Sequence, residues 1–270
     1  MFTDKQLDHY RTEGFVIVDD VVDPDMLARL LEAAKRVKQK VRVGEVDIYT
    51  HWAGPGEPWA IRGLFAPEIG EPDFADYLLT DPVMKYVQPI LGDELRLGGV
   101  LIFTNPYDDD YGFGWHRDSV RTKAEMGEEE ELELLNPDAP MNGLRWHLAL
   151  VDDACLMVVP GSHRRYRTPH ELQCLTEAEV RNEDISGQYA IPLKAGQAAF
   201  WNGKIIHRGV MKKDVERLTL SCSWSKHSEE GTPKDVDPRL RWLLANNVRD
   251  ALPEEMQVPY DRWRALQVDY

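Results

Sequence analysis

Gly114-Trp115-His116-Arg117-Asp118 is the stretch of sequence around which the fold and its chemistry are predicted. Side chains two residues apart in an extended chain point to the same face, so His116 and Asp118 are expected to converge on one point. A second imidazole from another strand would complete a set of two histidines and one carboxylate. That set binds non-haem Fe(II) and leaves coordination positions open. His207, at the end of the apolar run Ile205-Ile206, is the candidate.

A strictly alternating segment downstream supplies a cation for the same site. Residues 217 to 224 place Arg217, Thr219, Ser221 and Ser223 on one face and apolar side chains on the other, the pattern of a half-buried strand. The sequence predicts a hairpin from residues 204–207 to this strand, turning at 212–214, with His207 almost opposite Arg217. A guanidinium there can pair with the distal carboxylate of a 2-oxo diacid that chelates the metal through its 1-carboxylate and keto oxygen.

The rest of the chain predicts helices at both ends of a mainly antiparallel β core of about residues 95–225, all in one domain spanning 1–270. Helix starts are indicated at Thr3, Asp23-Pro24, Asp81-Pro82 and Thr176, and residues 237–250 have a helical pattern. Strands are predicted at 15–18, 95–104, 144–151, 156–159, 196–201 and 204–207. Residues 41–65 fit either a loop or irregular strand, and the polar stretch 119–143 either an exposed segment or a lid over the site.

Composition excludes several classes of function. The chain has 270 residues and a formal net charge of −15, which repels nucleic acids and anionic membrane surfaces. No apolar run approaches the roughly 18 residues of a membrane span. The three cysteines are widely spaced and contain no CxxC pair, which favours a cytoplasmic protein.

With these motifs in place, the sequence resembles the phytanoyl-CoA dioxygenase (PhyH) family of Fe(II)/2-oxoglutarate-dependent oxygenases. The resemblance covers most of residues 1 to 225. It rests on the opening at 10–18, on Trp115 to Asp118, on the segment from 148 to Pro160-Gly161-Ser162-His163, on 196–200, and on His207 and Arg217.

The resemblance implies a double-stranded β-helix (jelly-roll, cupin-like) core. It implies iron held by His116, Asp118 and His207, and 2-oxoglutarate held by Arg217, with Asn105 and Thr219 as further co-substrate contacts. The implied reaction consumes O2 and 2-oxoglutarate, hydroxylates a C–H bond of a small molecule, and releases succinate and CO2. Related halogenases have a small residue in place of the carboxylate ligand, so Asp118 favours hydroxylation or desaturation over halogenation.

Two positions depart from the family pattern. Gly209 stands where relatives often have a serine, which removes one hydrogen bond to the co-substrate. Asp153-Ala154 stands where relatives often have Asn-Gly, which indicates a locally altered turn.

The sequence leaves the substrate open between a CoA thioester, a secondary metabolite and an amino-acid derivative. Arg62 and His147 are the candidate substrate contacts, since Arg62 precedes the core near two tryptophans and His147 lies on the polar face of its strand. Two other functions remain to be weighed. One is a non-catalytic cupin-like protein that binds metal or ligand, and the other is a metal-dependent isomerase or hydrolase that needs no O2.

Overall fold

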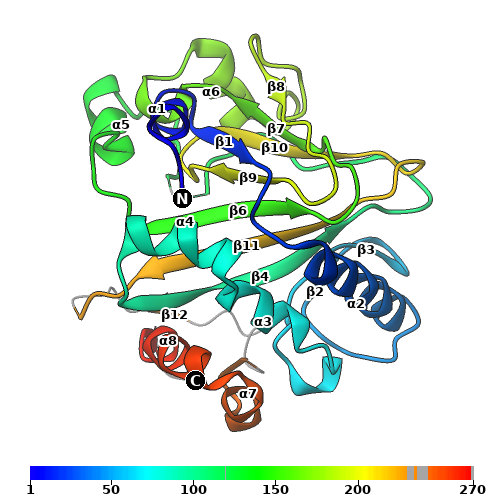
Figure 1. The fold of residues 1–270 in the computed structure, drawn as a ribbon. Helices are drawn as coiled ribbons and strands as arrows, with labels where there is room; N and C mark the ends of the chain where they lie inside the picture. The colour runs from blue at the N-terminus through cyan, green and yellow to red at the C-terminus, as the bar shows by residue number, and fades with distance from the viewer. Residues whose placement is uncertain (119, 230–233, 236–242, 269–270) are drawn as a thin grey trace.

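Two mainly antiparallel β-sheets face each other, with helices against the outer face of the larger sheet (Figure 1). The computed structural model describes residues 1–118, 120–229, 234–235 and 243–268. The larger sheet has the strand order β1 (Phe15–Val18), β9 (Ala198–Trp201), β6 (Gly143–Ala149), β11 (Leu218–Lys226), β4 (Leu95–Thr104), β3 (Glu57–Ile61) and β2 (Thr50–Gly54). The smaller sheet has the order β5 (Tyr111–Gly112), β10 (Ile206–Met211), β7 (Leu156–Val159) and β8 (Tyr189–Ala190).

The helices surround this pair of sheets. The N-terminal half contributes α1 (Asp4–Glu13), α2 (Pro24–Arg42), α3 (Asp73–Leu79) and α4 (Asp81–Leu91). Two short helices, α5 (Glu128–Leu135) and α6 (Pro169–Thr176), lie beside the smaller sheet, and α7 (Asn246–Ala251) and α8 (Glu254–Arg264) lie at the opposite end (Figure 1). A two-stranded parallel pair, β12 (Lys234–Asp235) with β13 (Gln267–Val268), completes the described elements, with 3-10 turns at Pro67–Ile69 and Ser162–Arg164.

The predicted helix starts are confirmed where a capping side chain makes its bond. Thr3 and Gln6 form a capping box at the start of α1, and Gly14, at φ 88°, ends that helix in the left-handed region. The carboxylate of Asp23 accepts a hydrogen bond from the backbone N–H of Met26, with Pro24 in the first turn of α2.

The two faces of the larger sheet bury different sets of side chains. Leu144, Trp146 and Leu148 of β6 pack in a core shared with α2, α3, α4 and α8. A second apolar cluster, which includes Leu156 and Trp201, lies between the two sheets. Arg145 and His147 alternate with the first set and line a cavity on the inner face, so the period-2 pattern of this strand fixes which side chains reach the cavity.

The predicted hairpin between residues 204–207 and 217–224 is wrong. β10 pairs with β7 in the smaller sheet, where His207 lies opposite Val158. β11 pairs with β4 and β6 in the larger sheet. The segment around 212–216 therefore crosses between sheets, and Arg217 and His207 both line the cavity.

Three other expectations are revised. The capping box expected at Thr176 lies at Thr168 and Glu171, so α6 ends at Thr176. Residues 41–65 contain the β2–β3 hairpin. Of the helix expected at 237–250, residues 237–242 lie outside the described part, and α7 begins at Asn246.

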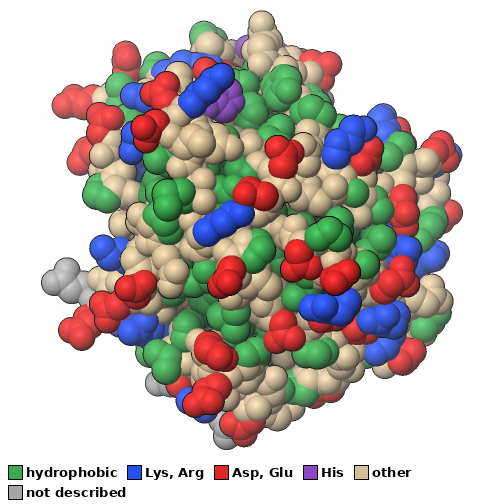
Figure 2. All heavy atoms as spheres, viewed as in Figure 1, with side chains coloured by type: hydrophobic (Ala, Val, Ile, Leu, Met, Phe, Trp, Pro, Cys, Tyr) green, Lys and Arg blue, Asp and Glu red, His purple; other side chains and the backbone are tan. Residues whose placement is uncertain are grey.

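Acidic side chains are dispersed over one face of the molecule. Figure 2 shows Asp and Glu side chains scattered among basic and apolar ones over the face that it displays. None of the described helices is both long enough and apolar enough to cross a bilayer.

Candidate active site

His116, Asp118 and His207 meet at one end of the cavity between the sheets. Nε2 of His116 lies 3.4 Å from Oδ1 of Asp118, and Nε2 of His207 lies 3.6 Å from the same oxygen. One ligand atom from each residue lies within 4.8 Å of the other two. The backbones of His116 and His207 exchange N–H···O=C hydrogen bonds of 3.0 Å, which fixes the two imidazoles side by side.

The hydrogen bonds of the two imidazoles direct their Nε2 atoms toward a metal. Nδ1 of His116 lies 2.9 Å from the carbonyl oxygen of Gly114, and Nδ1 of His207 lies 2.9 Å from that of Ile205. A nitrogen that donates to a carbonyl carries the proton, so Nε2 keeps its lone pair. Burial, followed by the charge of His116, lowers the pKa of His207 to about 4, so His207 is neutral as a metal ligand must be. The donor set therefore fits Fe(II).

Arg145 binds the other oxygen of Asp118. Its Nη1 donates to Oδ2, while its guanidinium lies 5.0 Å from the Trp201 ring. Burial by itself would raise the pKa of Asp118, but His116, His207 and Arg145 together hold it well below its usual range. Because Arg145 uses Oδ2, Oδ1 is the oxygen turned toward the imidazoles. Arg145 is not among the site residues predicted from the sequence, although it stands two residues before His147 on the same strand face.

Arg217 lies in the cavity wall and is already bound by a carboxylate. Its Nε donates to Oδ2 of Asp153 over 3.2 Å, and its Nη1 lies 3.1 Å from Sδ of Met211. Asp153 occupies the position where relatives often have asparagine, so the altered turn places a charge behind the guanidinium.

Asn105 and Thr219 lie outside the cavity lining. Oδ1 of Asn105 accepts hydrogen bonds from the backbone N–H of Arg217 at 2.9 Å and from Lys38 at 3.3 Å. Thr219 donates its hydroxyl to Asp153. Both residues therefore hold the start of β11 and its arginine, and the structure does not bring either to the cavity surface.

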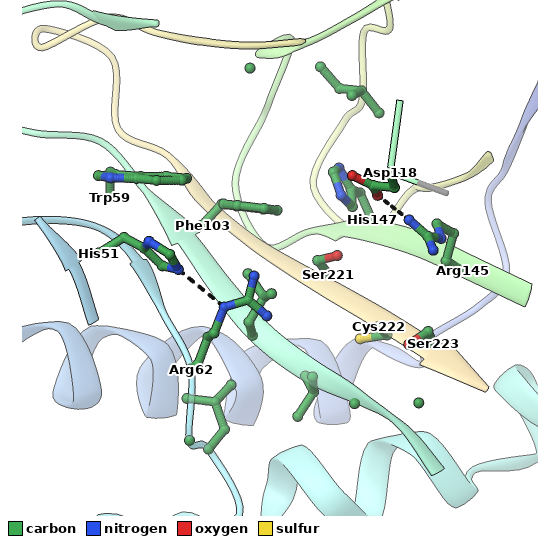
Figure 3. A pocket seen from close by; sticks show the side chains of 18 of the residues that line it. His51, Trp59, Arg62, Phe103, Asp118, Arg145, His147, Ser221, Cys222 and Ser223 are labelled. Atoms are coloured by element: carbon green, nitrogen blue, oxygen red, sulfur yellow. Dashed lines mark hydrogen bonds and ion pairs between the residues drawn. The ribbon is translucent and has the colours of Figure 1, made fainter. Parts of the chain in front are cut away.

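The cavity has a volume of about 530 Å³ and extends from the three metal-binding candidates to α8. Its walls are largely aromatic and aliphatic, with Trp59, Phe103, Phe113 and Trp201 prominent. Both substrate-contact candidates, Arg62 and His147, line it. Figure 3 shows Arg62 with His51 and Trp59 on one side and His147 beside Asp118 on the other, with Phe103 and Ser221 between.

His147 is buried in the cavity wall between two aromatic rings. Phe103 and Trp201 each lie 5.4 Å from its ring, edge to face. Burial, followed by the charge of Arg217, lowers its pKa to about 3, so the imidazole is neutral. Its Nδ1 makes no hydrogen bond within the described part of the chain.

The segment that follows Asp118 is anchored away from the cavity. Glu131 of α5 is fully buried and pairs with Arg117 at 2.7 Å and with Arg167. None of the described residues from 120 to 142 lines the cavity, so they give the lid interpretation no support. Arg117 points away from the metal-binding side chains, as expected for the middle residue of an extended tripeptide.

Comparisons with known proteins agree with this geometry. Residues 10–210 match the sequence model of the family described as Phytanoyl-CoA dioxygenase (PhyH). Among solved structures, AviO1 from Streptomyces viridochromogenes Tue57 shares 18% identity over 85% of this chain and 96% of its own, with a TM-score of 0.59. EctD from S. alaskensis, solved with 2-oxoglutarate and 5-hydroxyectoine, shares 20% identity over 83% of this chain and 76% of its own, with a TM-score of 0.61.

SnoN, an alpha ketoglutarate dependent epimerase from nogalamycin biosynthesis, shares 18% identity over 83% of this chain and 81% of its own, with a TM-score of 0.57. A comparison with curated proteins finds no match. The predicted jelly-roll class is confirmed by these shared folds.

Proposed function

Because the chain belongs to the phytanoyl-CoA dioxygenase (PhyH) family and is a 2-oxoglutarate-dependent oxygenase, we propose that it hydroxylates an unactivated C–H bond of a small molecule. The products beside the hydroxylated substrate are succinate and CO2. The observation that carries the proposal is the convergence of His116, Asp118 and His207 in one cavity with Arg217.

The three converging side chains would hold Fe(II). Two imidazoles and one carboxylate would form a ligand set that leaves positions on non-haem Fe(II) open for co-substrate and O2. Bound iron supplies the oxidative decarboxylation of 2-oxoglutarate and the C–H oxidation coupled to it. Arg145 binds Oδ2 of Asp118, so Oδ1 would be the oxygen that holds the metal.

Arg217 binds the distal carboxylate of 2-oxoglutarate. The Nε of Arg217 donates to Asp153, so the Nη side of the guanidinium lies toward Met211 and Gly209 in the cavity wall. The co-substrate thus meets a guanidinium whose plane is already fixed, and little side-chain entropy is lost on binding.

Aromatic rings pack against the two histidines of the proposed metal site. Phe113 packs edge to face on His116 at 4.8 Å, and Trp201 lies 4.5 Å from His207. A neutral His147 beside them adds no charge to the reaction space. Burial strengthens the electrostatic contacts of Arg217, whose side chain is almost fully enclosed.

Hydroxylation is favoured over halogenation because a carboxylate stands at position 118. The fold itself permits other outcomes, since SnoN is described as an epimerase and SnoK, from the same biosynthesis, as a carbocyclase. The proposal therefore rests on the ligand set of this chain, and the substrate decides which bond reacts.

Anaerobic addition of Fe(II) and 2-oxoglutarate tests the proposal. We expect the weak visible metal-to-ligand charge-transfer band of a chelated 2-oxo acid and, after O2 is admitted, succinate. Asp118→Ala should lose both signals, whereas Asp109→Ala, at an exposed turn, should keep both. Bound iron without O2 consumption would favour a non-catalytic binding protein, and turnover without O2 an isomerase or hydrolase.

A further inference from the structure

We propose that His147 and Ser221 form a hydrogen-bonding subsite for an uncharged hydroxyl group of the substrate. The hydroxyl is joined to an apolar body that packs on the aromatic walls of the same cavity. This inference rests on the proposed function and names the class of substrate, an uncharged apolar alcohol.

The charged side chains of the described lining already have partners. Arg145 donates to Asp118, and Nε of Arg62 donates to an imidazole of the β2–β3 hairpin over 3.3 Å. Arg217 donates to a carboxylate behind it and is the candidate for the co-substrate. With 2-oxoglutarate bound, a charged substrate group would lose hydration in this cavity without meeting, among the described lining residues, a cation that has no partner. Recognition of the substrate therefore falls to uncharged polar groups.

His147 supplies a hydrogen-bond donor to the cavity from β6. Its side chain lines the cavity although the residue is only 4% exposed. Nδ1 is enclosed by protein and makes no hydrogen bond within the described residues, and an enclosed N–H without an acceptor is rarer than an enclosed bare acceptor. The ring proton therefore belongs on Nε2. Nε2 has no partner among the same residues either, but it is not enclosed, so its N–H is directed into the cavity.

Ser221 lies beside His147 on the neighbouring strand. The two residues are directly opposite each other in the pairing of β11 with β6, and cross-strand neighbours of this kind have Cβ atoms about 4.5–5.5 Å apart. Both line the cavity, and Figure 3 shows them near Asp118. One oxygen atom of a ligand can therefore accept a hydrogen bond from Nε2 of His147 and donate its own proton to Oγ of Ser221. A hydroxyl group does both, whereas an ether oxygen only accepts.

Aromatic rings flank this pair of polar side chains. Phe103 lies 5.4 Å from the ring of His147, and it stacks on Trp59 at 6.2 Å with an angle of 8° between the ring planes. An apolar body along these rings gains about 25 cal/mol for each Å² of apolar surface that it buries. Because His147 lies beside Asp118, a hydroxyl bound there holds the adjoining part of the body close to the metal-binding side chains.

Anaerobic calorimetry on the Fe(II)·2-oxoglutarate complex tests the inference without turnover. The probes are 3-phenylpropan-1-ol, its methyl ether and 3-phenylpropionate. We expect the alcohol to bind about three- to tenfold more tightly than the ether, as one additional neutral hydrogen bond would give. The carboxylate should bind more weakly than the alcohol, because saturating 2-oxoglutarate occupies Arg217.

Two substitutions test the two contacts separately. Ser221→Ala should lower the affinity for the alcohol about three- to tenfold and leave that for the ether unchanged, so the preference disappears. His147→Leu should lower both affinities by about the same factor, since both probes accept from Nε2. Ser225→Ala, on the same strand and outside the cavity lining, should change neither. Titration of the charge-transfer band should give one affinity for 2-oxoglutarate in all variants.

Equal affinities of the unaltered protein for alcohol and ether overturn the inference, and so does tighter binding of the carboxylate or a preference that survives in Ser221→Ala. Weaker 2-oxoglutarate binding in His147→Leu would make His147 a contact of the co-substrate and overturn the assignment as well. The result with Ser221→Ala stands even if His147→Leu does not fold, because it removes a single oxygen atom from the cavity surface. If the unaltered protein shows no charge-transfer band, the proposed function itself fails, and this inference falls with it.

Discussion

Nε of Arg217 lies 3.2 Å from Oδ2 of Asp153, and both side chains are almost fully buried. The same oxygen accepts the hydroxyl of Thr219, and Oδ1 accepts the backbone N–H of Cys155 at 2.7 Å. Burial would raise the pKa of Asp153, but Arg217 and Thr219 hold it well below its usual range. Asp153 is therefore ionised, and it fixes the orientation of the Arg217 guanidinium.

Asp153→Asn is expected to lower the free energy of unfolding by about 3 kcal/mol, because Arg217 would remain buried without a counter-ion. Urea denaturation measures this loss. The neighbouring Asp152→Asn is the matched control, since Asp152 pairs with Lys194 on the surface. This substitution should lower the free energy of unfolding by less than about 1 kcal/mol. The double variant Asp153→Asn/Arg217→Met should lose less than the sum of the two single losses. Additive losses would mean that the pair is not coupled.

Arg145→Gln is expected to weaken Fe(II) binding about 10- to 100-fold, because Asp118 would lose the donor that orients its carboxylate. Anaerobic competition with a chromophoric chelator measures the affinity. Arg145→Lys keeps the positive charge and should retain part of the affinity for Fe(II). Arg96→Gln, on β4 and outside the cavity lining, should bind iron as the unaltered protein does. Unchanged affinity in Arg145→Gln would show that the triad is held without this arginine.

Glu131→Gln is expected to cost about 3–5 kcal/mol of stability, because Arg117 and Arg167 would lose the carboxylate that they share in the interior. Glu130→Gln, one residue earlier in α5 and exposed, should leave the urea midpoint unchanged. Similar midpoints for the two variants would contradict the role of Glu131 as the buried anchor of α5.

Local patterns predicted the side chains that reach the site. The alternation of β6 placed His147 on the inner face, and that of β11 did so for Arg217. The spacing of His116 and Asp118 predicted their convergence, which the structure shows. These predictions depend only on backbone periodicity, which a single strand carries in its own sequence. That residues 1–270 form one domain stays a prediction.

Strand partners could not be predicted in the same way. In a jelly roll both sheets present one apolar and one polar face, so β10 and β11 look like neighbours in a hairpin although they lie in different sheets. The roles of Asn105 and Asp153 were hidden for a related reason. Each residue contacts Arg217 from more than 60 positions away in the sequence, so no local pattern predicts the contact.

Gly209→Ser is expected to tighten 2-oxoglutarate binding about two- to tenfold, because a hydroxyl beside Arg217 would supply the hydrogen bond that relatives often make from this position. A Cβ at Gly209 would lie 3.5 Å from Sδ of Met211 and 3.9 Å from Nη1 of Arg217, which is ordinary van der Waals contact. The strand therefore accommodates the side chain. Titration of the charge-transfer band with 2-oxoglutarate measures the affinity.

Gly209→Ala separates the hydroxyl from the added carbon. It should leave the affinity for 2-oxoglutarate within about twofold of the unaltered protein, since a methyl group donates no hydrogen bond. Both variants should be at least as stable as the unaltered protein, because glycine in a strand interior costs conformational entropy. Equal affinities in the serine and alanine variants would show that the co-substrate carboxylate lies out of reach of position 209. Arg217 would then bind it from the side facing away from β10.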